Sequence, residues 1–324
     1  MPDQIYDKSY KTLLSKKRNF LMMLRSFVNK KWVDKIKESS LIRVDTEFVL
    51  PDFTKRIADN IYRAEFEDSV FYFYILNELQ STPDFTMPLR FLSLSTELFK
   101  LEFLNTPKNI RESEGYRLPI IVPILLYNGE FRWNVVRSFK EYQRGNELFG
   151  KEIIDFSYIV IDINRIDDSK LSKISNLIST VFFLDKKISY KDKKWGKRLH
   201  SAFEAYSKFT DEEKQDFIGW FENVFVKKVK GLDDSSKLTD MFIEGDVDKM
   251  TYAIDRAFEE CREDGIKEGI EKGIEKGIER AKEEFVYNML IEGFDTNVVA
   301  KVSRLSIEDV AELKETLRTE GRLI

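Results

Sequence analysis

The sequence predicts an α/β fold, with a mixed sheet flanked by helices and a helical extension at the C-terminal end. Residues 57–66 and 70–80 are rich in Ile, Tyr, Phe and Val and flank a short polar bend, which indicates a two-stranded hairpin. Two further apolar runs of strand length lie within residues 118–127 and 156–163. Because continuous apolar strands belong in the centre of a sheet covered on both faces, helices are expected to pack on either side.

The first predicted element is an amphipathic helix or pair of helices over residues 9–27, where apolar residues recur at near-helical spacing. Asp7 lies at the predicted start of this segment. There it would either cap the helix or, as the family resemblance given below implies, approach the candidate metal site of the hairpin as an additional N-terminal acid.

The hairpin carries the main candidate site. Side chains alternate between the faces of a strand, so a turn of two or four residues sets Asp59 opposite Leu76, on the face that also carries Glu78 and Gln80. Glu78 is then the diagonal neighbour of Asp59 at about 7 Å, whereas a slip of one residue would move Asp59 to the other face. Two such carboxylates and the Leu79 carbonyl match the oxygen ligands that Mg²⁺ prefers. The alternative is a pair of acids at the solvated end of a half-buried hairpin.

Three features after the hairpin bear on the site. A helix is predicted over residues 86–104, and Arg90 on it faces either a phosphate or a neighbouring acid. The next strand ends at Asn128-Gly129, a strong hairpin-turn signal that predicts a structural role for this pair. The last predicted strand carries Asp162 close to its end, where a turn or cap role and a catalytic role both fit.

The pattern of elements predicts three parts of the chain. Residues 1–255 form the core domain, with a helical extension over about 170–255 whose apolar stripes are expected to pack in the core. Residues 256–282 contain the repeat GIKEGIEKGIEKGIER and form a helical linker, and residues 283–324 form a small helical module that resembles a helix-turn-helix.

The repeat has a four-residue period, so its glycine and isoleucine columns drift by about 40° per repeat around a helix. Each glycine costs roughly 1 kcal/mol relative to alanine in a helix, and interleaved Glu and Lys compensate only slightly. A charged helical spacer is the favoured interpretation, and self-association through the repeat is the alternative. In the C-terminal module Asp295 and Ser306 are predicted N-caps, and packing or dimerisation is favoured over DNA reading.

Composition limits the classes of function. The single Cys261 and single His200 argue against an intrachain disulfide, a Cys- or His-rich metal site and a His-dependent triad. The net charge of −4 is not that of a general nucleic-acid binder, so DNA contact would need a local basic patch, such as residues 186–198, unless that run is a solvated face. No apolar run reaches the ~20 residues of a membrane helix and the start lacks a signal-peptide pattern, so a cytoplasmic protein without membrane contact is expected.

These residues resemble a known family, the recombination-promoting nuclease (Rpn)/putative transposase family, a branch of the PD-(D/E)XK nuclease superfamily. Its core segment has an Asp on one strand, then E-x-Q-S, then D, M and R, and the corresponding residues here are Asp59, Glu78-Leu79-Gln80-Ser81, Asp84, Met87 and Arg90. The resemblance extends from Asp7-Lys8 to Trp133, roughly the first half of the chain. C-terminal Gly-Ile repeats are a further feature shared with the family. Two residues depart from the pattern: Tyr6 stands where the family often has His, and Gln80 where the superfamily usually has Lys.

The resemblance implies a restriction-endonuclease-like core and a metal-dependent DNA endonuclease that promotes recombination and is associated with mobile elements. Asp59, Glu78 and the Leu79 carbonyl would bind Mg²⁺ or Mn²⁺, and Gln80 would orient the attacking water. Lys8 and Arg90 are candidates for phosphate contact. The partner would be DNA, with the protein at the nucleoid when bound. Two alternatives are a catalytically silent nuclease fold that binds DNA or protein, and a structural homo-oligomer organised by the repeat or the C-terminal helices.

Overall fold

The structure is a computed structural model that describes residues 2–44, 60–66, 69–78, 82–187, 195–229, 236–319 and 321. The chain divides into two compact units, Met1–Asp255 and Arg256–Ile324.

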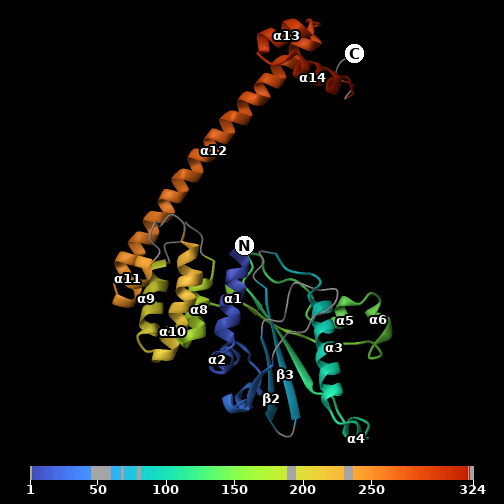
Figure 1. The fold of residues 1–324 in the computed structure, drawn as a ribbon, viewed down its shortest axis with the longest axis vertical. Coiled ribbons are helices and arrows are strands. Elements are labelled where there is room, and N and C mark those ends of the chain that lie inside the picture. Colours follow the sequence, from blue (N-terminus) through green and yellow to red (C-terminus); the bar gives the residue numbers. More distant parts are fainter. Residues whose placement is uncertain are drawn as a thin grey trace. The chain divides into compact units, whose positions relative to one another are not determined.

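The first unit is built on a five-stranded mixed sheet, which confirms the predicted α/β fold (Figure 1). The strands lie side by side in chain order, with the first two pairs antiparallel and the last two pairs parallel. They are β1 (Leu41–Val44), β2 (Asn60–Phe66), β3 (Ser69–Glu78), β4 (Ile120–Tyr127) and β5 (Ile159–Asp162). β1 is a short edge strand that the sequence pattern did not predict.

The β2–β3 hairpin has the register that a two-residue turn requires. Phe66 pairs with Ser69 at the turn, and Asn60 pairs with Ile75 at the other end of the described ladder. Asp59 lies outside the described residues, so its predicted position opposite Leu76 stays a prediction.

One face of the sheet is covered by α3 (Met87–Asn105), close to the helix predicted over residues 86–104 (Figure 1). Pro88 lies in its first turn, where a residue without an N–H is tolerated. Met87 and Phe91 on the helix belong to one buried cluster with Leu125 and Tyr127 of β4. Three short helices also belong to this part of the chain: α4 (Lys108–Arg111), α5 (Phe139–Tyr142) and α6 (Asn146–Phe149).

The opposite face is covered by the predicted N-terminal pair, α1 (Pro2–Leu14) and α2 (Lys17–Phe27) (Figure 1). Phe20 stacks on Tyr62 of β2 with ring centroids 4.3 Å apart, and the Tyr62 hydroxyl donates to the Leu14 carbonyl at 2.7 Å. The prediction that Asp7 caps the first helix is wrong. The helix already begins at Pro2, a residue suited to a first helical turn, so Asp7 lies inside it.

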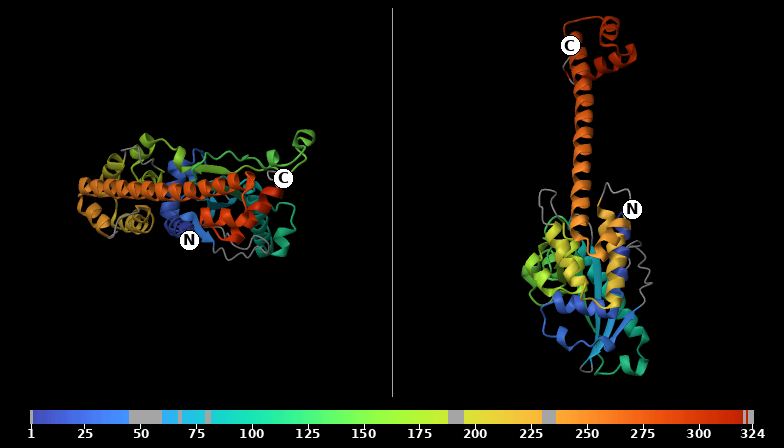
Figure 2. Two further views of the ribbon diagram at one scale, coloured as in Figure 1. Left: turned by 90° about the horizontal axis from the view of Figure 1, so that it is seen from above. Right: turned by 90° about the vertical axis from the view of Figure 1, so that its left-hand side faces the viewer.

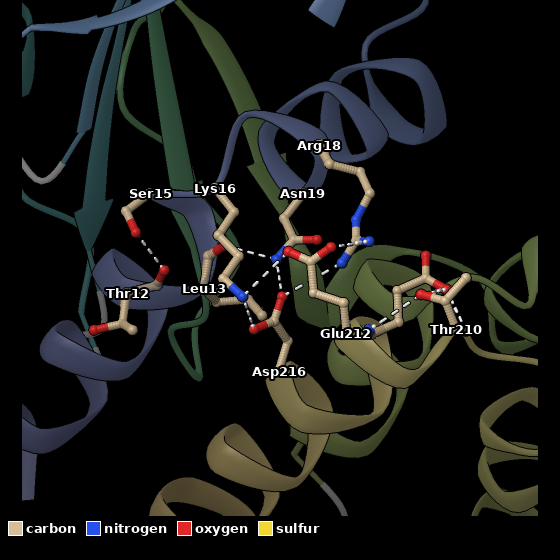
Figure 3. A network of polar contacts seen from close by, with 10 residues as sticks. Thr12, Leu13, Ser15, Lys16, Arg18, Asn19, Thr210, Glu212 and Asp216 are labelled. Atoms are coloured by element: carbon tan, nitrogen blue, oxygen red, sulfur yellow. Dashed lines mark hydrogen bonds and ion pairs between the residues drawn. The ribbon is translucent and has the colours of Figure 1, made fainter.

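An ion-pair network holds the turn between α1 and α2 against α10 (Asp211–Trp220), as Figure 3 shows. Lys16 Nζ lies 2.6 Å from Asp216 Oδ1, and Asn19 donates to Asp216 Oδ2 at 2.9 Å. Arg18 reaches Glu212 at 2.9 Å. The hydrogen bond to Asp216 raises the pKa of Lys16, so the pair stays ionised well above neutral pH.

The predicted helical extension packs as an aromatic-rich core. Phe217, Phe221, Phe225 and Phe242 are fully buried and contact one another, which agrees with a packing role for these apolar stripes. The remaining elements of the unit are η1 (Val33–Lys35), η2 (Glu38–Ser40), η3 (Ile163–Arg165), α7 (Asp168–Ile174), α8 (Leu177–Asp185), α9 (Trp195–Tyr206), the π-helix η4 (Phe221–Val226) and α11 (Ser236–Glu244).

The Gly-Ile repeat lies within a single helix, α12 (Val247–Ile291), which runs without a break for 45 residues and enters the second unit (Figure 2). It is followed by α13 (Thr296–Ser303) and α14 (Ile307–Thr319). The predicted caps are confirmed: Asp295 accepts from the Asn297 amide at 2.8 Å, and Ser306 accepts from the Asp309 amide at 3.0 Å. No helix in the described part of the chain has the length and apolar composition that a membrane crossing requires.

Candidate functional site

The carboxyl ends of three parallel strands meet at one edge of the sheet. Glu78 at the end of β3 is in register with Tyr127 of β4, which is in register with Asp162 of β5. Residues in register across a sheet share a face, so positions 78 and 162 lie on the face that holds Tyr127. In open α/β sheets, ligands bind outside the carboxyl ends of parallel strands. This edge therefore brings together two of the acid positions that the sequence analysis selected.

Asp162 is half-buried and only partly satisfied. Its Oδ2 accepts a hydrogen bond from the backbone amide of Trp133 at 3.4 Å, whereas its buried Oδ1 has no hydrogen-bond partner within the described part of the chain. Burial raises the pKa of this carboxyl, and the Trp133 amide opposes that shift. Since buried acceptors are normally paired, the Oδ1 atom is available to a donor such as an ordered water.

Buried aromatic side chains pack against one another next to this edge. Tyr127 is fully buried and donates to the Phe131 carbonyl at 2.8 Å, and its ring meets that of Trp133 edge-on at 5.0 Å. The Trp133 indole donates to the Tyr158 hydroxyl at 3.2 Å, and that hydroxyl donates to the Val136 carbonyl at 2.8 Å. Burial raises the pKa of Tyr158 to about 12, so it remains a neutral hydrogen-bond donor at physiological pH.

The predicted hairpin turn at Asn128-Gly129 is wrong, because the strands before and after it are parallel. Asn128 is instead buried, donating to Asp185 and accepting from Asn164 Nδ2 at 2.7 Å. A Cβ at Gly129 would lie about 2 Å from the phenol ring of Tyr127, closer than any side chain tolerates. The sequence pattern marks a close backbone approach rather than a reversal of the chain.

Asp185 at the end of α8 is a buried carboxylate that the sequence analysis missed. It accepts a hydrogen bond from Tyr10 of α1 at 2.8 Å and another from Asn128, and it forms an ion pair with Lys228, just after the π-helix η4. The available sequence signal was an acid that ends the apolar segment LISTVFFL. A buried charge needs partners, so this one fixes α1 and the end of β4 relative to each other.

Arg90 pairs with a neighbouring acid, the second of the two roles expected for it. Its guanidinium lies 2.7 Å from Asp84 Oδ2, and both side chains are largely buried. Asp84 Oδ1 also accepts from the amide and hydroxyl of Thr86, at 2.8 and 2.6 Å. Burial alone would raise the pKa of Asp84, but these hydrogen bonds and Arg90 hold it below its usual value. Two of the motif positions therefore order the start of α3.

The described part of the proposed basic patch contains both paired and exposed cations: Lys187 reaches Glu130 at 3.4 Å, and Lys197 is exposed. Lys186 and Arg198 both contact Asp168, at 2.5 and 3.1 Å, and Arg198 is itself buried. Residues 188–194 of the run lie outside the described ranges. The ion pairs at Asp168 favour a local structural role for these two cations over phosphate contact.

For most of the other predicted site residues, the structure does not describe the position of the side chain. Asp59, Leu79 and Gln80 lie outside the described residues, and for Glu78 the position at the end of β3 is described. Lys8 is exposed on α1 and lines a pocket of about 610 Å³ formed with α10 and η4. Among the side chains that the structure describes, no group of three or more His, Cys, Asp or Glu could hold a metal ion. The metal site thus remains a prediction.

Comparison with known proteins assigns the family. The family model described as "Putative transposase, YhgA-like" matches residues 4–214, a segment that contains the five described strands, most of α1, and α2 to α9. No curated protein and no solved structure gives a significant match. The family match confirms the resemblance that the hairpin motifs predicted. Because the matched segment is more than half of the 324 residues, the chain belongs to this family, "Putative transposase, YhgA-like".

Proposed function

We propose that the protein is a metal-dependent DNA endonuclease that hydrolyses phosphodiester bonds and promotes recombination, with its site at the carboxyl end of β3. Membership of a transposase family supports a role in mobile-element DNA. The observation that carries the proposal is the register of Glu78, Tyr127 and Asp162, which gathers acid positions at the edge where open α/β sheets bind ligands.

Asp59 and Glu78 would hold Mg²⁺ or Mn²⁺ together with the Leu79 carbonyl, a set of hard oxygen ligands that suits either ion. The pairing of Asn60 with Ile75 supports this assignment, since the predicted neighbourhood of Asp59 and Glu78 depends on that register. When bound, the ion supplies activation of water and neutralises charge on the phosphodiester.

The remaining roles follow from the chemistry of each side chain. Gln80 would orient the attacking water through its amide, although it lacks the charge of the usual lysine. The unsatisfied Oδ1 of Asp162 would accept a hydrogen bond from water at the same edge. Lys8 is exposed and suited to phosphate contact, whereas the ion pair of Arg90 with Asp84 favours a positioning role.

The test is cleavage of supercoiled plasmid by the full-length protein with Mg²⁺, Mn²⁺, Ca²⁺ or EDTA. Asp59→Asn and Glu78→Gln should each lower the rate at least a hundredfold, with thermal melting checking that they fold. Glu65→Gln is the matched control, because Glu65 is an exposed acid of the same hairpin whose partner is Arg63. Binding of Mn²⁺ followed by electron paramagnetic resonance gives a second readout that does not depend on cleavage.

Cleavage that survives in both folded variants would place the chemistry elsewhere. A wild-type protein that is folded, binds DNA and cuts with none of the metals would instead favour a nuclease fold used as a binding scaffold.

A further inference from the structure

The middle of α12 presents an apolar strip that the described part of the chain leaves exposed, although its last isoleucine, Ile278, also lines a pocket of about 630 Å³ with Leu305 and Leu313 of the same unit. Every residue from 262 to 285 is exposed. The isoleucines of the repeat are more than half exposed: Ile266, Ile270, Ile274 and Ile278 at 52, 56, 58 and 53%. Next to them, a Cβ built on any of the four glycines of the repeat meets nothing within 4 Å.

A helix of this composition gains little from its own sequence. Glycine is unfavourable in a helix interior, and most helical stability in proteins comes from packing of an apolar face. The repeat instead combines four glycines with a regular line of exposed isoleucines. A surface that covers this line would supply the packing that the helix lacks.

The charges of the repeat are arranged in columns beside that line. Residues four apart lie one above the other on a helix, and each step of one residue turns the helix by about 100°. In the last three repeats the column after the isoleucines is acidic and the next is basic, the members being Glu271, Glu275 and Glu279, then Lys272, Lys276 and Arg280. Over these three repeats the glycine–isoleucine strip therefore has an acidic edge on one side and a basic edge on the other, whereas in the first repeat Lys267 and Glu268 stand in the reverse order.

We propose that the strip is covered by the same strip of a second copy of the chain, packed parallel to it. In a parallel two-fold pair, each edge of one strip faces the opposite edge of the other, so acid meets base on both sides. In an antiparallel pair, acid would face acid and base would face base. The charge pattern thus selects the parallel orientation.

The glycines set the geometry of this contact. Without side chains they let two backbones approach closely, while the adjacent isoleucines fill the space beside them. Ridges of residues four apart pack at a crossing angle near −50°, so the two helices cross over a few turns rather than winding around each other for their whole length. The ion pair between Lys272 and Glu268 within the helix is two-thirds exposed at both side chains, so exchanging it for contacts across the pair costs little.

A parallel pair has a structural consequence. Each chain enters α12 at Val247, so two parallel helices begin at the same end of the pair. Two copies of the first unit are then attached at one end, whereas an antiparallel pair would attach them at opposite ends.

The first test is the association of the full-length protein by sedimentation equilibrium. Ile270→Lys combined with Ile274→Lys should weaken the dimer at least tenfold, and circular dichroism should show that the fold is retained. Tyr252→Lys is the control, because Tyr252 is 71% exposed on α12 but lies outside the repeat. A monomeric wild type, or a dimer that the double substitution leaves unchanged, would overturn the proposal.

The second test is the orientation of the helices. In a Cys261→Ser background, Gly265→Cys and Gly277→Cys introduce thiols near the two ends of the repeat, about 18 Å apart along one helix. A short bis-maleimide should cross-link each variant to itself. Cross-linking that occurs only when the two variants are mixed would mean an antiparallel pair and would refute the assignment. Neither test requires nuclease activity, so each can fail or succeed independently of the proposed function.

Discussion

Replacing Lys228 by methionine isolates the contribution of the buried Asp185 network. Methionine keeps most of the length and the apolar stem of lysine but removes the cation that pairs with the Asp185 carboxylate. Asp185 is fully buried and, among the contacts of the described residues, its carboxylate would retain the donors from Tyr10 and Asn128. The substitution therefore leaves a buried carboxylate without a counter-charge.

The expected cost follows from the burial of the two partners. Removing one partner of a buried ion pair typically costs about 3–5 kcal/mol. Lys228 is 28% exposed, so solvent already weakens the pair, and about 2–3 kcal/mol is expected. For a unit of this size that corresponds to a fall in Tm of roughly 5–10 °C. Removing the charge as well, in Asp185→Asn with Lys228→Met, should cost less than Lys228→Met alone, because no uncompensated carboxylate remains.

Tryptophan fluorescence during thermal unfolding is the appropriate assay, since all four tryptophans lie in the first unit and report on it alone. Lys227→Met is the control: the neighbouring lysine is exposed, contacts only the Asn223 amide oxygen in the described structure, and should shift stability by less than about 0.5 kcal/mol. Equal melting of Lys228→Met and wild type, or a double variant at least as unstable as Lys228→Met, would refute the electrostatic reasoning.

Gly129→Ala should destabilise the first unit by at least about 2 kcal/mol, because the new methyl group overlaps the Tyr127 ring; unchanged chemical denaturation would contradict the close approach. Arg90→Gln should cost about 1–2 kcal/mol at neutral pH. Asp84 has a lowered pKa, so its stabilising contribution is present above the unfolded value of 3.8 and is lost as pH falls through the folded value. The difference from wild type should accordingly shrink below pH 4, and a constant difference in urea melts across that range would argue against the ion pair. If the nuclease and the parallel pair are both correct, the isoleucine-to-lysine double substitution in the repeat should lower the ratio of linear to nicked plasmid product without abolishing nicking.

Much of the fold could be predicted because local pattern and tertiary structure agree. The hairpin, β4 and β5 follow from apolar runs of strand length, and burial in the sheet reinforces that pattern instead of opposing it. The helix predicted over residues 86–104 agrees with α3, which packs on the sheet. β1 was missed because LIRV is too short to show a period. The turn at Asn128-Gly129 was misassigned because the dipeptide indicates a close approach of the backbone but does not indicate whether the next strand is antiparallel or parallel.

The candidate site was predictable only in part, for a related reason. Sequence spacing indicates which acids belong to one strand, and the register of the hairpin follows from its turn length. The proximity of Glu78 to Asp162 depends instead on two parallel crossovers, whose register no local pattern encodes. The pairing of Asp185 with Tyr10 joins residues 175 apart in the chain, so only the assembled core brings them together.

The structure divides the family motif residues into two groups with different consequences. Arg90, Asp84, Gly129 and Trp133 hold the edge of the sheet through an ion pair, a close backbone approach and hydrogen bonds, and each of these contacts is needed whether or not the protein cuts DNA. Their presence therefore indicates a folded edge rather than an active enzyme. Selection for a binding scaffold would maintain the residues of this group, whereas the residues proposed as metal ligands could be replaced. A charge-removing substitution at Glu78 that abolishes cleavage while Tm stays unchanged would thus separate chemistry from architecture more cleanly than any change within the first group.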